Sequence, residues 1–182
     1  MTDPSASTTT TNPREEPMLR KVTWPVGLAA KGKLFLSSMP GRFELLEVFF
    51  REIKDAGVTH VVCLVSDEEI AKKSPGYLAT IQGNGFPATL WRSNIPDYGM
   101  PGNIQALELM LDRIRERLDA GESVVIHCAA GHGRTGMVAI LLLMRMGLRL
   151  EEAAGIIRQA GSAPDTPDQW AFLRSREEDY IR

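Results

Sequence analysis

The segment between Ser123 and Met146 constrains the fold more than any other part of the sequence. Residues 123–128 read SVVIHC, a short apolar and β-branched run that is typical of a buried strand. A loop of small residues follows, and residues 134–146 then carry apolar side chains on every side of a helix. A helix without a polar face has to be buried. The segment therefore predicts a core strand, a bare loop and a central helix around which the rest of the chain packs.

Further strands alternate with amphipathic helices along the rest of the chain. Strands are predicted at residues 33–38, 59–65 and 88–93. Helices are predicted over residues 42–57, 104–118 and 150–160, and from Thr166-Pro167 onward. Strands that alternate with helices imply an α/β fold, with a single domain built on a central, mostly parallel twisted sheet and helices on both of its faces.

Composition limits the class of protein. Residues 1–17 contain no Leu, Ile, Val or aromatic residue and are predicted to be a disordered tail, which leaves residues 18–182 as the folded domain. The net charge of −2 argues against a nucleic-acid partner, and the longest apolar run, Met137–Met144, is too short to cross a membrane. Cysteine is sparse, with only Cys63 and Cys128, and no apolar leader is present, so we expect a cytoplasmic protein. We also expect a monomer.

The loop between the predicted strand and the buried helix carries the chemistry. Cys128 ends the strand, and Arg134 opens the helix after five intervening residues. These five leave the backbone N–H groups free to turn inward and bind an anion, and the helix N-terminus adds positive charge. Arg134 can hold two phosphate oxygens, and the same surroundings favour a thiolate on Cys128. The loop therefore fits a site that binds a phosphate group and attacks its phosphorus.

Two nucleotide-binding alternatives fit the same loop less well. Residues 131–136 match the pattern G-x-G-x-x-G of dinucleotide-binding proteins. That fold needs a further strand with an acidic residue at its end, whereas the segments after the loop are predicted to be helical. A triphosphate-binding loop would need Lys followed by Ser or Thr, and this loop contains no lysine.

The pattern His127-Cys128, five residues, Arg134-Thr135 resembles the signature of the cysteine-dependent protein tyrosine phosphatase superfamily. Residues 95–101 (IPDYGMP) resemble the general-acid loop of its compact dual-specificity branch. The likeness is greatest to small atypical dual-specificity phosphatases and to the kinase-associated phosphatase, and it covers most of residues 33–182. The acid loop precedes the cysteine, as in that branch, whereas low-molecular-weight tyrosine phosphatases have the opposite order.

The resemblance implies a role for each catalytic residue. Cys128 would be the nucleophile, and Arg134 would bind the phosphate oxygens in the transition state. Asp97 would protonate the leaving oxygen and later activate water, although Pro-Asp is also ordinary turn chemistry. Thr135 would hydrogen-bond the sulfur when it becomes the leaving group, with helix packing as the alternative.

Other residues would support the loop or bind substrate. Gln169 would contact the loop or orient water, but a glutamine on a helix surface is an equally good interpretation. Residues 66–69 (SDEE) follow a predicted strand and form either an acidic rim near the site or, the preferred interpretation, a solvated helix start. His127 and Gly136 would support the loop, and substrate would be bound by Ala129, Ala130, Gly131, His132 and Gly133, with the orientation of His132 left open.

The resemblance also limits the substrate and the cofactor. No Lys-Asn-Arg-Tyr segment is present to wall a deep tyrosine-specific pocket, so we expect a shallow one that admits phosphotyrosine and phosphoserine or phosphothreonine of proteins. A loop without lysine argues against a phosphoinositide. No cofactor is expected, and His60, His127 and His132 make no metal-ligand cluster. The open alternatives are a phosphopeptide-binding module with little turnover and a phosphatase for a small non-protein ester.

Overall fold

The structure of the protein is a computed structural model, which describes residues 17–28 and 30–180. The predicted disordered tail, residues 1–17, therefore lies outside the described residues apart from Pro17. The signature cysteine, the predicted acid loop and the predicted strands and helices fall within the described part of the chain, apart from residues 181–182 at the end of the last predicted helix.

A five-stranded sheet forms the middle of the described domain. Its strands are β1 (Arg20–Lys21), β2 (Lys33–Ser37), β3 (Val58–Cys63), β4 (Thr89–Arg92) and β5 (Ser123–His127). They lie in the order β1-β2-β5-β3-β4, and every pair is parallel except β1 with β2. All four predicted strands are confirmed within one or two residues at each end. The short strand β1 was not predicted, because two residues cannot show an alternating pattern.

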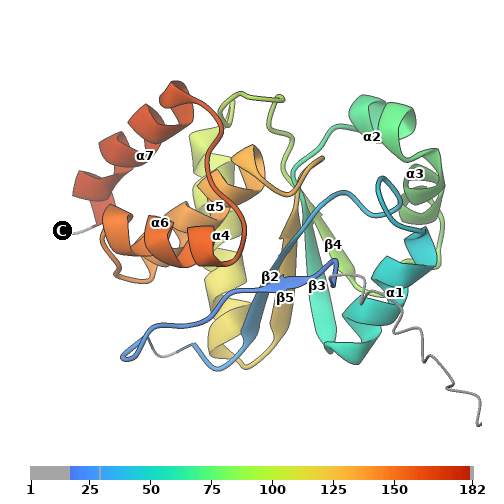
Figure 1. Ribbon diagram of the computed structural model, residues 1–182, viewed down its shortest axis with the longest axis horizontal. Helices are drawn as coiled ribbons and strands as arrows, with labels where there is room; N and C mark the ends of the chain where they lie inside the picture. The colour runs from blue at the N-terminus through green and yellow to red at the C-terminus, as the bar shows by residue number, and fades with distance from the viewer. Residues whose placement is uncertain (1–16, 29, 181–182) are drawn as a thin grey trace, which may run out of the picture.

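Helices cover both faces of this sheet. They are α1 (Leu46–Asp55), α2 (Asp67–Lys73), α3 (Pro75–Gln82), α4 (Ile104–Asp119), α5 (Gly133–Arg145), α6 (Leu150–Gln159) and α7 (Pro167–Tyr180). Figure 1 shows α1, α2 and α3 beside one face and α4, α5, α6 and α7 beside the other. This arrangement confirms the predicted α/β fold. None of the described helices is long and apolar enough to cross a membrane.

Helix α5 is the centre of the larger core. All its residues from Gly133 to Met144 are buried, as its apolar sequence predicts. They pack with Val124 and Ile126 of β5 and with apolar residues of α4, α6 and α7. The alternate residue Val125 points to the opposite face, where it packs with Phe49 of α1. The sheet is therefore buried on both sides, which is typical of parallel sheets.

The first helix is shorter than predicted. The prediction of a helix over residues 42–57 is wrong at its start, because α1 begins at Leu46. The preceding chain is instead used as a loop: Met39 N–H donates to the carbonyl of Ala129 at 3.1 Å, and Arg42 N–H turns back to the carbonyl of Met39. Neither α2 nor α3 was predicted as a full helix, since seven and eight residues are too few for a clear helical period.

Three loops converge at the carboxyl edge of the sheet. In the parallel ladder Cys63 of β3 lies opposite both His127 of β5 and Arg92 of β4, so the three strands end side by side. Strand β5 continues into residues 128–133, β3 into α2, and β4 into residues 93–103. The carboxyl edge of a parallel sheet is where such folds bind ligands.

Candidate active site

Cys128 lies in a loop whose backbone turns toward its sulfur. We call residues 128–133, between β5 and α5, the signature loop. Cys128 is 3% exposed, and Gly131 N–H donates to its Sγ at 3.3 Å. The sulfur therefore lies where a backbone N–H and the N-terminus of α5 converge, and such a place favours a bound anion.

Arg20 and Ser162 brace the signature loop from outside. The carbonyl oxygen of Gly131 accepts from Nη2 of Arg20 at 2.5 Å and from the hydroxyl of Ser162 at 3.0 Å. Gly131 has a φ of +76°, and a Cβ there would lie 2.6 Å from the carbonyl oxygen of Ser37. Only glycine fits this position. Sequence reasoning missed Arg20, because nothing in the sequence links an arginine near the N-terminus to a distant loop.

His127 supports the loop as a neutral ring. Burial lowers its pKa to about 4, so the imidazole is uncharged near neutral pH. Burial also raises the pKa of Tyr77, whose O–H donates to Nε2 of His127 at 2.8 Å. The other nitrogen, Nδ1, then carries the proton and donates to the carbonyl of Cys128 at 3.1 Å. His127 thus makes the backbone contact expected of a residue that supports the loop.

Arg134 is buried and paired with Glu69. The arginine is 2% exposed and donates from Nη1 and Nη2 to the two carboxylate oxygens of Glu69, at 2.7 and 3.0 Å. Nη1 also donates to the carbonyl of Ile95 at 3.1 Å. Hydrogen bonding from Arg134 lowers the pKa of Glu69 to about 2. The sequence placed Glu69 only in a short acidic run, and its position just after a strand of the parallel sheet was the available signal.

Asp97 meets Arg134 directly. It belongs to residues 93–103, which we call the acid loop, and its side chain is 49% exposed. One carboxylate oxygen lies 2.8 Å from Nη2 of Arg134, and the other lies 3.7 Å from Nζ of Lys73. Lys73 also pairs with Glu69 at 2.5 Å. The structure thus brings the predicted acid and the predicted phosphate-binding arginine together within one charged cluster.

The segment between α6 and α7 touches both loops. Gly133 N–H, in the first turn of α5, donates to the carboxylate of Asp165 at 3.0 Å. Gln169 is fully buried, which excludes the helix-surface alternative. Its side chain contacts Asp165 and the carbonyl of Gly99 in the acid loop, and it makes no recorded hydrogen bond to the signature loop within the described residues. Asp165 was missed, because a single aspartate in a Pro-rich turn is ordinary turn chemistry.

The remaining predicted residues divide into buried and exposed ones. Thr135 is fully buried, and its hydroxyl has no hydrogen-bond partner among the described residues. Gly136 lies so close to the next segment that a Cβ would fall 2.6 Å from the carbonyl carbon of Ala163. Ala130 and His132 are exposed.

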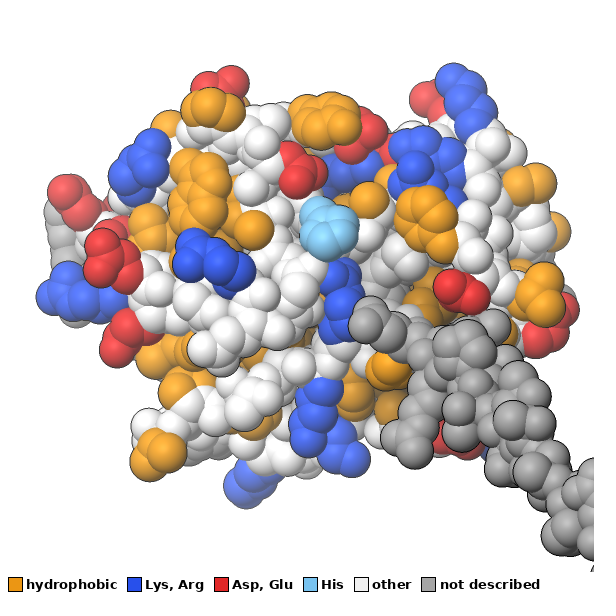
Figure 2. All heavy atoms as spheres, viewed as in Figure 1, with side chains coloured by type: hydrophobic (Ala, Val, Ile, Leu, Met, Phe, Trp, Pro, Cys, Tyr) orange, Lys and Arg blue, Asp and Glu red, His pale blue; other side chains and the backbone are white. Residues whose placement is uncertain are grey.

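The molecular surface carries charged side chains of both signs. Figure 2 shows a histidine side chain near the centre of one face, with basic and acidic side chains beside it.

The acidic run at residues 66–69 has two different surroundings. The hydroxyl of Ser66 accepts from Glu69 N–H at 3.2 Å and caps α2. Asp67 pairs with Arg92 at 2.6 Å, and Glu68 is exposed. The interpretation as a solvated helix start therefore holds for the first three residues. The Glu69 side chain instead turns inward to the charged cluster of Arg134, Asp97 and Lys73.

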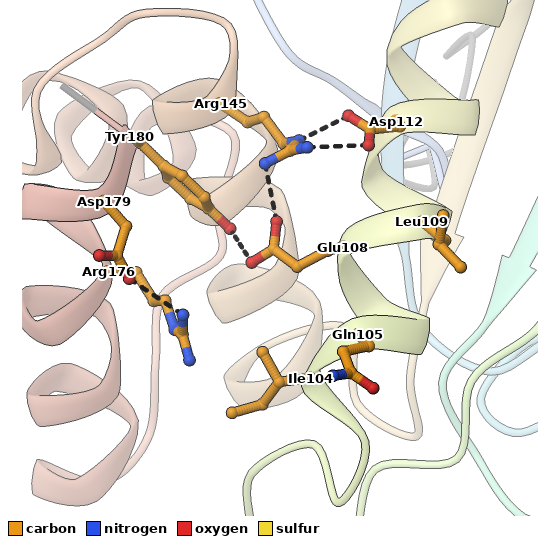
Figure 3. A pocket seen from close by; sticks show the side chains of 9 residues that line it. All are labelled: Ile104, Gln105, Glu108, Leu109, Asp112, Arg145, Arg176, Asp179 and Tyr180. Carbon is orange, nitrogen blue, oxygen red and sulfur yellow. Dashed lines mark hydrogen bonds and ion pairs between the residues drawn. The ribbon is translucent and has the colours of Figure 1, made fainter. Parts of the chain in front are cut away.

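A cavity of about 580 Å³ lies apart from the signature loop and is lined by residues of α4, α5 and α7. In it Arg145 donates to both carboxylate oxygens of Asp112, at 2.6 and 2.8 Å, and to Glu108 (Figure 3). Tyr180 O–H donates to Glu108 at 2.5 Å. These charged groups pair with one another, so we place the candidate active site at the signature loop. Within residues 17–28 and 30–180, no three His, Cys, Asp or Glu side chains are grouped to hold a metal ion.

Comparison with known sequences identifies the class. A family model described as "Polymorphic toxin system, DSP-PTPase phosphatase" matches residues 37–148, which contain the acid loop and the signature loop. Protein tyrosine phosphatase type IVA 2 of Mus musculus is 30% identical over 151 residues, covering 82% of this chain and 84% of the relative. Protein tyrosine phosphatase type IVA 3 of Bos taurus is 28% identical over 153 residues, covering 82% of each chain.

Solved structures agree with this class. The kinase associated phosphatase matches with a TM-score of 0.72 over 85% of this chain and 90% of its own, and at 22% identity it shows the fold alone. Tk-PTP in its active form matches with a TM-score of 0.62 at 30% identity, over 86% of this chain and 99% of its own. Fold and site together define a cysteine-dependent tyrosine or dual-specificity phosphatase. The chain belongs to the DSP-PTPase phosphatase family, as its resemblance predicted, and is an enzyme that hydrolyses phosphate esters of phosphoproteins.

Proposed function

We propose that the protein removes phosphate from tyrosine and from serine or threonine side chains, without a metal ion, through a cysteinyl-phosphate on Cys128. One observation carries this proposal: three groups, from the signature loop, from the start of α5 and from the acid loop, meet at one edge of the sheet. They are the Cys128 sulfur under the N–H of Gly131, the buried guanidinium of Arg134, and the carboxylate of Asp97, 2.8 Å from that guanidinium. A nucleophile, a phosphate-binding cation and an acid are what ester hydrolysis needs.

In the first step the thiolate of Cys128 attacks phosphorus. A P–S bond forms, and the P–O bond to the substrate oxygen breaks. The other three phosphate oxygens lie against the N–H groups of the signature loop and against Arg134, which stabilise the charge that spreads over them. Asp97, in its protonated form, gives its proton to the leaving oxygen, so the substrate leaves as a neutral alcohol or phenol.

The guanidinium of Arg134 can bind a phosphate group in place of Asp97 and keep its hydrogen bonds to Glu69. Within the described residues its recorded contacts use Nη1, with Glu69 and Ile95, and Nη2, with Glu69 and Asp97. Nε–H therefore remains as a donor beside Nη2. A phosphate bound to Nε and Nη2 displaces Asp97 from the guanidinium and leaves Glu69 in place. The displaced carboxyl group is then available to the leaving oxygen.

In the second step water attacks the phosphorus of the cysteinyl-phosphate. Asp97, now a carboxylate, takes a proton from the water, the P–S bond breaks, and inorganic phosphate and the Cys128 thiolate are formed. Thr135 donates its hydroxyl to the departing sulfur. The support for this role is that the hydroxyl is buried at the start of α5 without a partner among the described residues.

The proposal extends to the substrate and the setting. Ala130 and His132, both exposed, form the outer part of the loop and would contact the substrate protein, which fits an open site that accepts several phosphorylated side chains. The catalytic groups named here all come from residues 18–182 of one chain, so we take this range as the catalytic domain and the protein as a monomer. Both cysteines are free thiols, which fits the reducing cytoplasm.

Phosphatase assays with a metal chelator test the proposal. Wild-type protein should release phosphate from para-nitrophenyl phosphate and from phosphotyrosyl and phosphothreonyl peptides, and vanadate should block all three reactions. Cys128→Ser should lose turnover and keep phosphate binding, while Cys63→Ala, the matched cysteine control, should stay active. Turnover that needs a metal ion, or that persists in Cys128→Ser, would contradict the mechanism. Peptide binding without turnover would favour a binding module, and activity on small esters alone would favour a non-protein substrate.

A further inference from the structure

We infer that Gln169 and Thr166 are positioning residues that latch the acid loop onto the segment that holds the signature loop. The inference rests on the proposed function, because it requires Asp97 to be the general acid. It assigns Gln169 a task other than orienting the attacking water. We call residues 165–169, at the junction of α6 and α7, the latch segment.

Both ends of the Gln169 amide are already bonded. Its Oε1 accepts from Asp165 N–H at 2.8 Å, and its Nε2 donates to the carbonyl of Gly99 at 3.1 Å. The residue has no exposed surface. A glutamine that orients water must present a free donor or acceptor to the open site. The bonds of Gln169 instead join the latch segment to the acid loop.

Thr166 makes the neighbouring contact with the acid loop. Its hydroxyl accepts from Gln169 N–H at 3.2 Å, as a cap of α7, and lies 3.5 Å from the carbonyl oxygen of Tyr98. The start of α7 therefore bonds the carbonyl of Gly99 and contacts the carbonyl of Tyr98. These are the two residues that directly follow Asp97, so their anchoring limits where the carboxylate can lie.

The acid loop has a conformation that needs such anchoring. Tyr98 has a φ of +55°, a left-handed conformation that residues other than glycine rarely adopt. Gly99 N–H closes a tight turn onto the carbonyl of Pro96 at 2.9 Å, and a Cβ on Gly99 would lie 3.0 Å from Pro96 Cβ. A strained turn of this kind persists only when the surrounding structure holds it. The contacts of Thr166 and Gln169 with the carbonyls of Tyr98 and Gly99 stabilise this turn.

The latch segment also holds the signature loop. The carboxylate of Asp165 accepts Gly133 N–H at 3.0 Å, and the backbone N–H of the same residue is bonded to Gln169. Since His132, the residue before α5, provides no side-chain cap, Asp165 caps this helix from a neighbouring segment. One short segment therefore connects Gly133, next to Arg134, with the loop that carries Asp97.

The inference predicts a loss of activity that depends on the leaving group. Gln169→Met keeps the length of the side chain and removes both amide bonds. It should lower kcat/KM for phenyl phosphate, a poor leaving group, about tenfold, because removal of a general acid costs about 10²–10⁴-fold and a misplaced acid costs less. For dinitrophenyl phosphate, whose first step needs no acid, kcat/KM, which reports that step, should change less than about twofold. Asp168→Asn, an exposed change in the same turn, is the control and should match wild type on both substrates.

Two further measurements separate the latch from a water-orienting role. With phenyl phosphate, loss of an oriented water would slow only the second step, so phosphoenzyme would accumulate and phenol would appear in a burst. With the same substrate, loss of the latch would make the acid-dependent first step slower, without a burst. In addition, Gln169→Met should lower the activity of the Asp97→Asn variant only slightly further, because the latch acts through Asp97. A burst with phenyl phosphate, equal losses of kcat/KM on both substrates, or fully additive losses in the double variant would overturn the latch.

A second pair of variants covers the case in which Gln169→Met does not fold. Thr166→Val removes the hydroxyl at constant size and should show the same leaving-group-dependent loss, whereas Thr166→Ser keeps the hydroxyl and should restore activity. Equal activity of these two variants would also overturn the latch. The proposed function fails separately: if Asp97→Asn itself loses kcat/KM equally on phenyl and dinitrophenyl phosphate, Asp97 is not the acid, whatever the Gln169 variant does.

Discussion

Replacing Glu69 by Gln removes the negative charge that faces the buried guanidinium of Arg134. Two hydrogen bonds of 2.7 and 3.0 Å join these side chains, and Arg134 is 2% exposed. Hydrogen bonding from Arg134 lowers the pKa of Glu69 from its usual 4.5 to about 2. A pKa lowered by this much corresponds to about 3 kcal/mol of folding free energy at neutral pH. We therefore expect Glu69→Gln to lose up to that amount at pH 7.

The loss should depend on pH in a defined direction. Because the pKa of Glu69 is lower in the folded state than in the unfolded state, the carboxylate stabilises the fold fully above pH 4.5 and progressively less as the pH falls toward 2. The difference in unfolding free energy between wild type and Glu69→Gln should be largest at pH 7, at most about 3 kcal/mol, and should become smaller as the pH falls through 4.5 toward 2. Urea unfolding followed by circular dichroism at several pH values measures it directly.

Glu68→Gln is the matched control, since Glu68 is an exposed neighbour on the same helix. It should change the unfolding free energy by less than about 0.5 kcal/mol at every pH. The reasoning is refuted if Glu69→Gln loses no more than this control at pH 7, or if its loss is the same at pH 7 and at pH 3.5. Glu69→Gln should also lower kcat, because the glutamine no longer holds both guanidinium nitrogens of Arg134.

Two further predictions concern the arginine and the second cysteine. Arg134→Lys keeps the charge but loses the planar, two-pronged guanidinium, so kcat should fall on the order of 10²-fold while the inhibition constant of inorganic phosphate rises far less; a near-normal kcat would remove Arg134 from the transition state. Mild peroxide should inactivate the enzyme through sulfenic acid on Cys128, without a disulfide. Cys128 belongs to the core on one face of the sheet, whereas Cys63 packs against Ile70 and Tyr77 on the other face. Burial also raises the pKa of the Cys63 thiol. A linked Cys63–Cys128 peptide as the main product in mass spectrometric mapping would contradict this.

Much of the fold follows from patterns that are local in the sequence. The helix α5 is apolar on every side and the strand before it is β-branched, so both were predicted and both form the core. Strand β1 was missed because its two residues pair only with the distant β2. The start of α1 was misplaced because the chain at Met39 hydrogen-bonds to Ala129 of the signature loop. Periodicity reports which face is buried and carries no information about such long-range backbone pairing.

The site was predictable where its residues have fixed spacing. Cys128 begins the signature loop and Arg134 directly follows it in the first turn of α5, and Asp97 lies in a loop whose residue types resemble a known one. Glu68 and Glu69 differ in a way that the sequence does not show: adjacent residues of a helix point about 100° apart, so one meets solvent and the other meets Arg134. Which of the two turns inward depends on how α2 sits on the sheet, and this is a property of packing.

The most direct test of the account is to look for phosphate on Cys128. With Asp97→Asn and dinitrophenyl phosphate, the first step needs no acid and the second step lacks its base, so the intermediate should accumulate. The protein is denatured rapidly during turnover and its peptides are analysed by mass spectrometry. We expect one phosphate, on the peptide that contains Cys128 and on its sulfur. Phosphate on another residue, or steady turnover with no phosphorylated protein, would contradict a cysteinyl-phosphate mechanism.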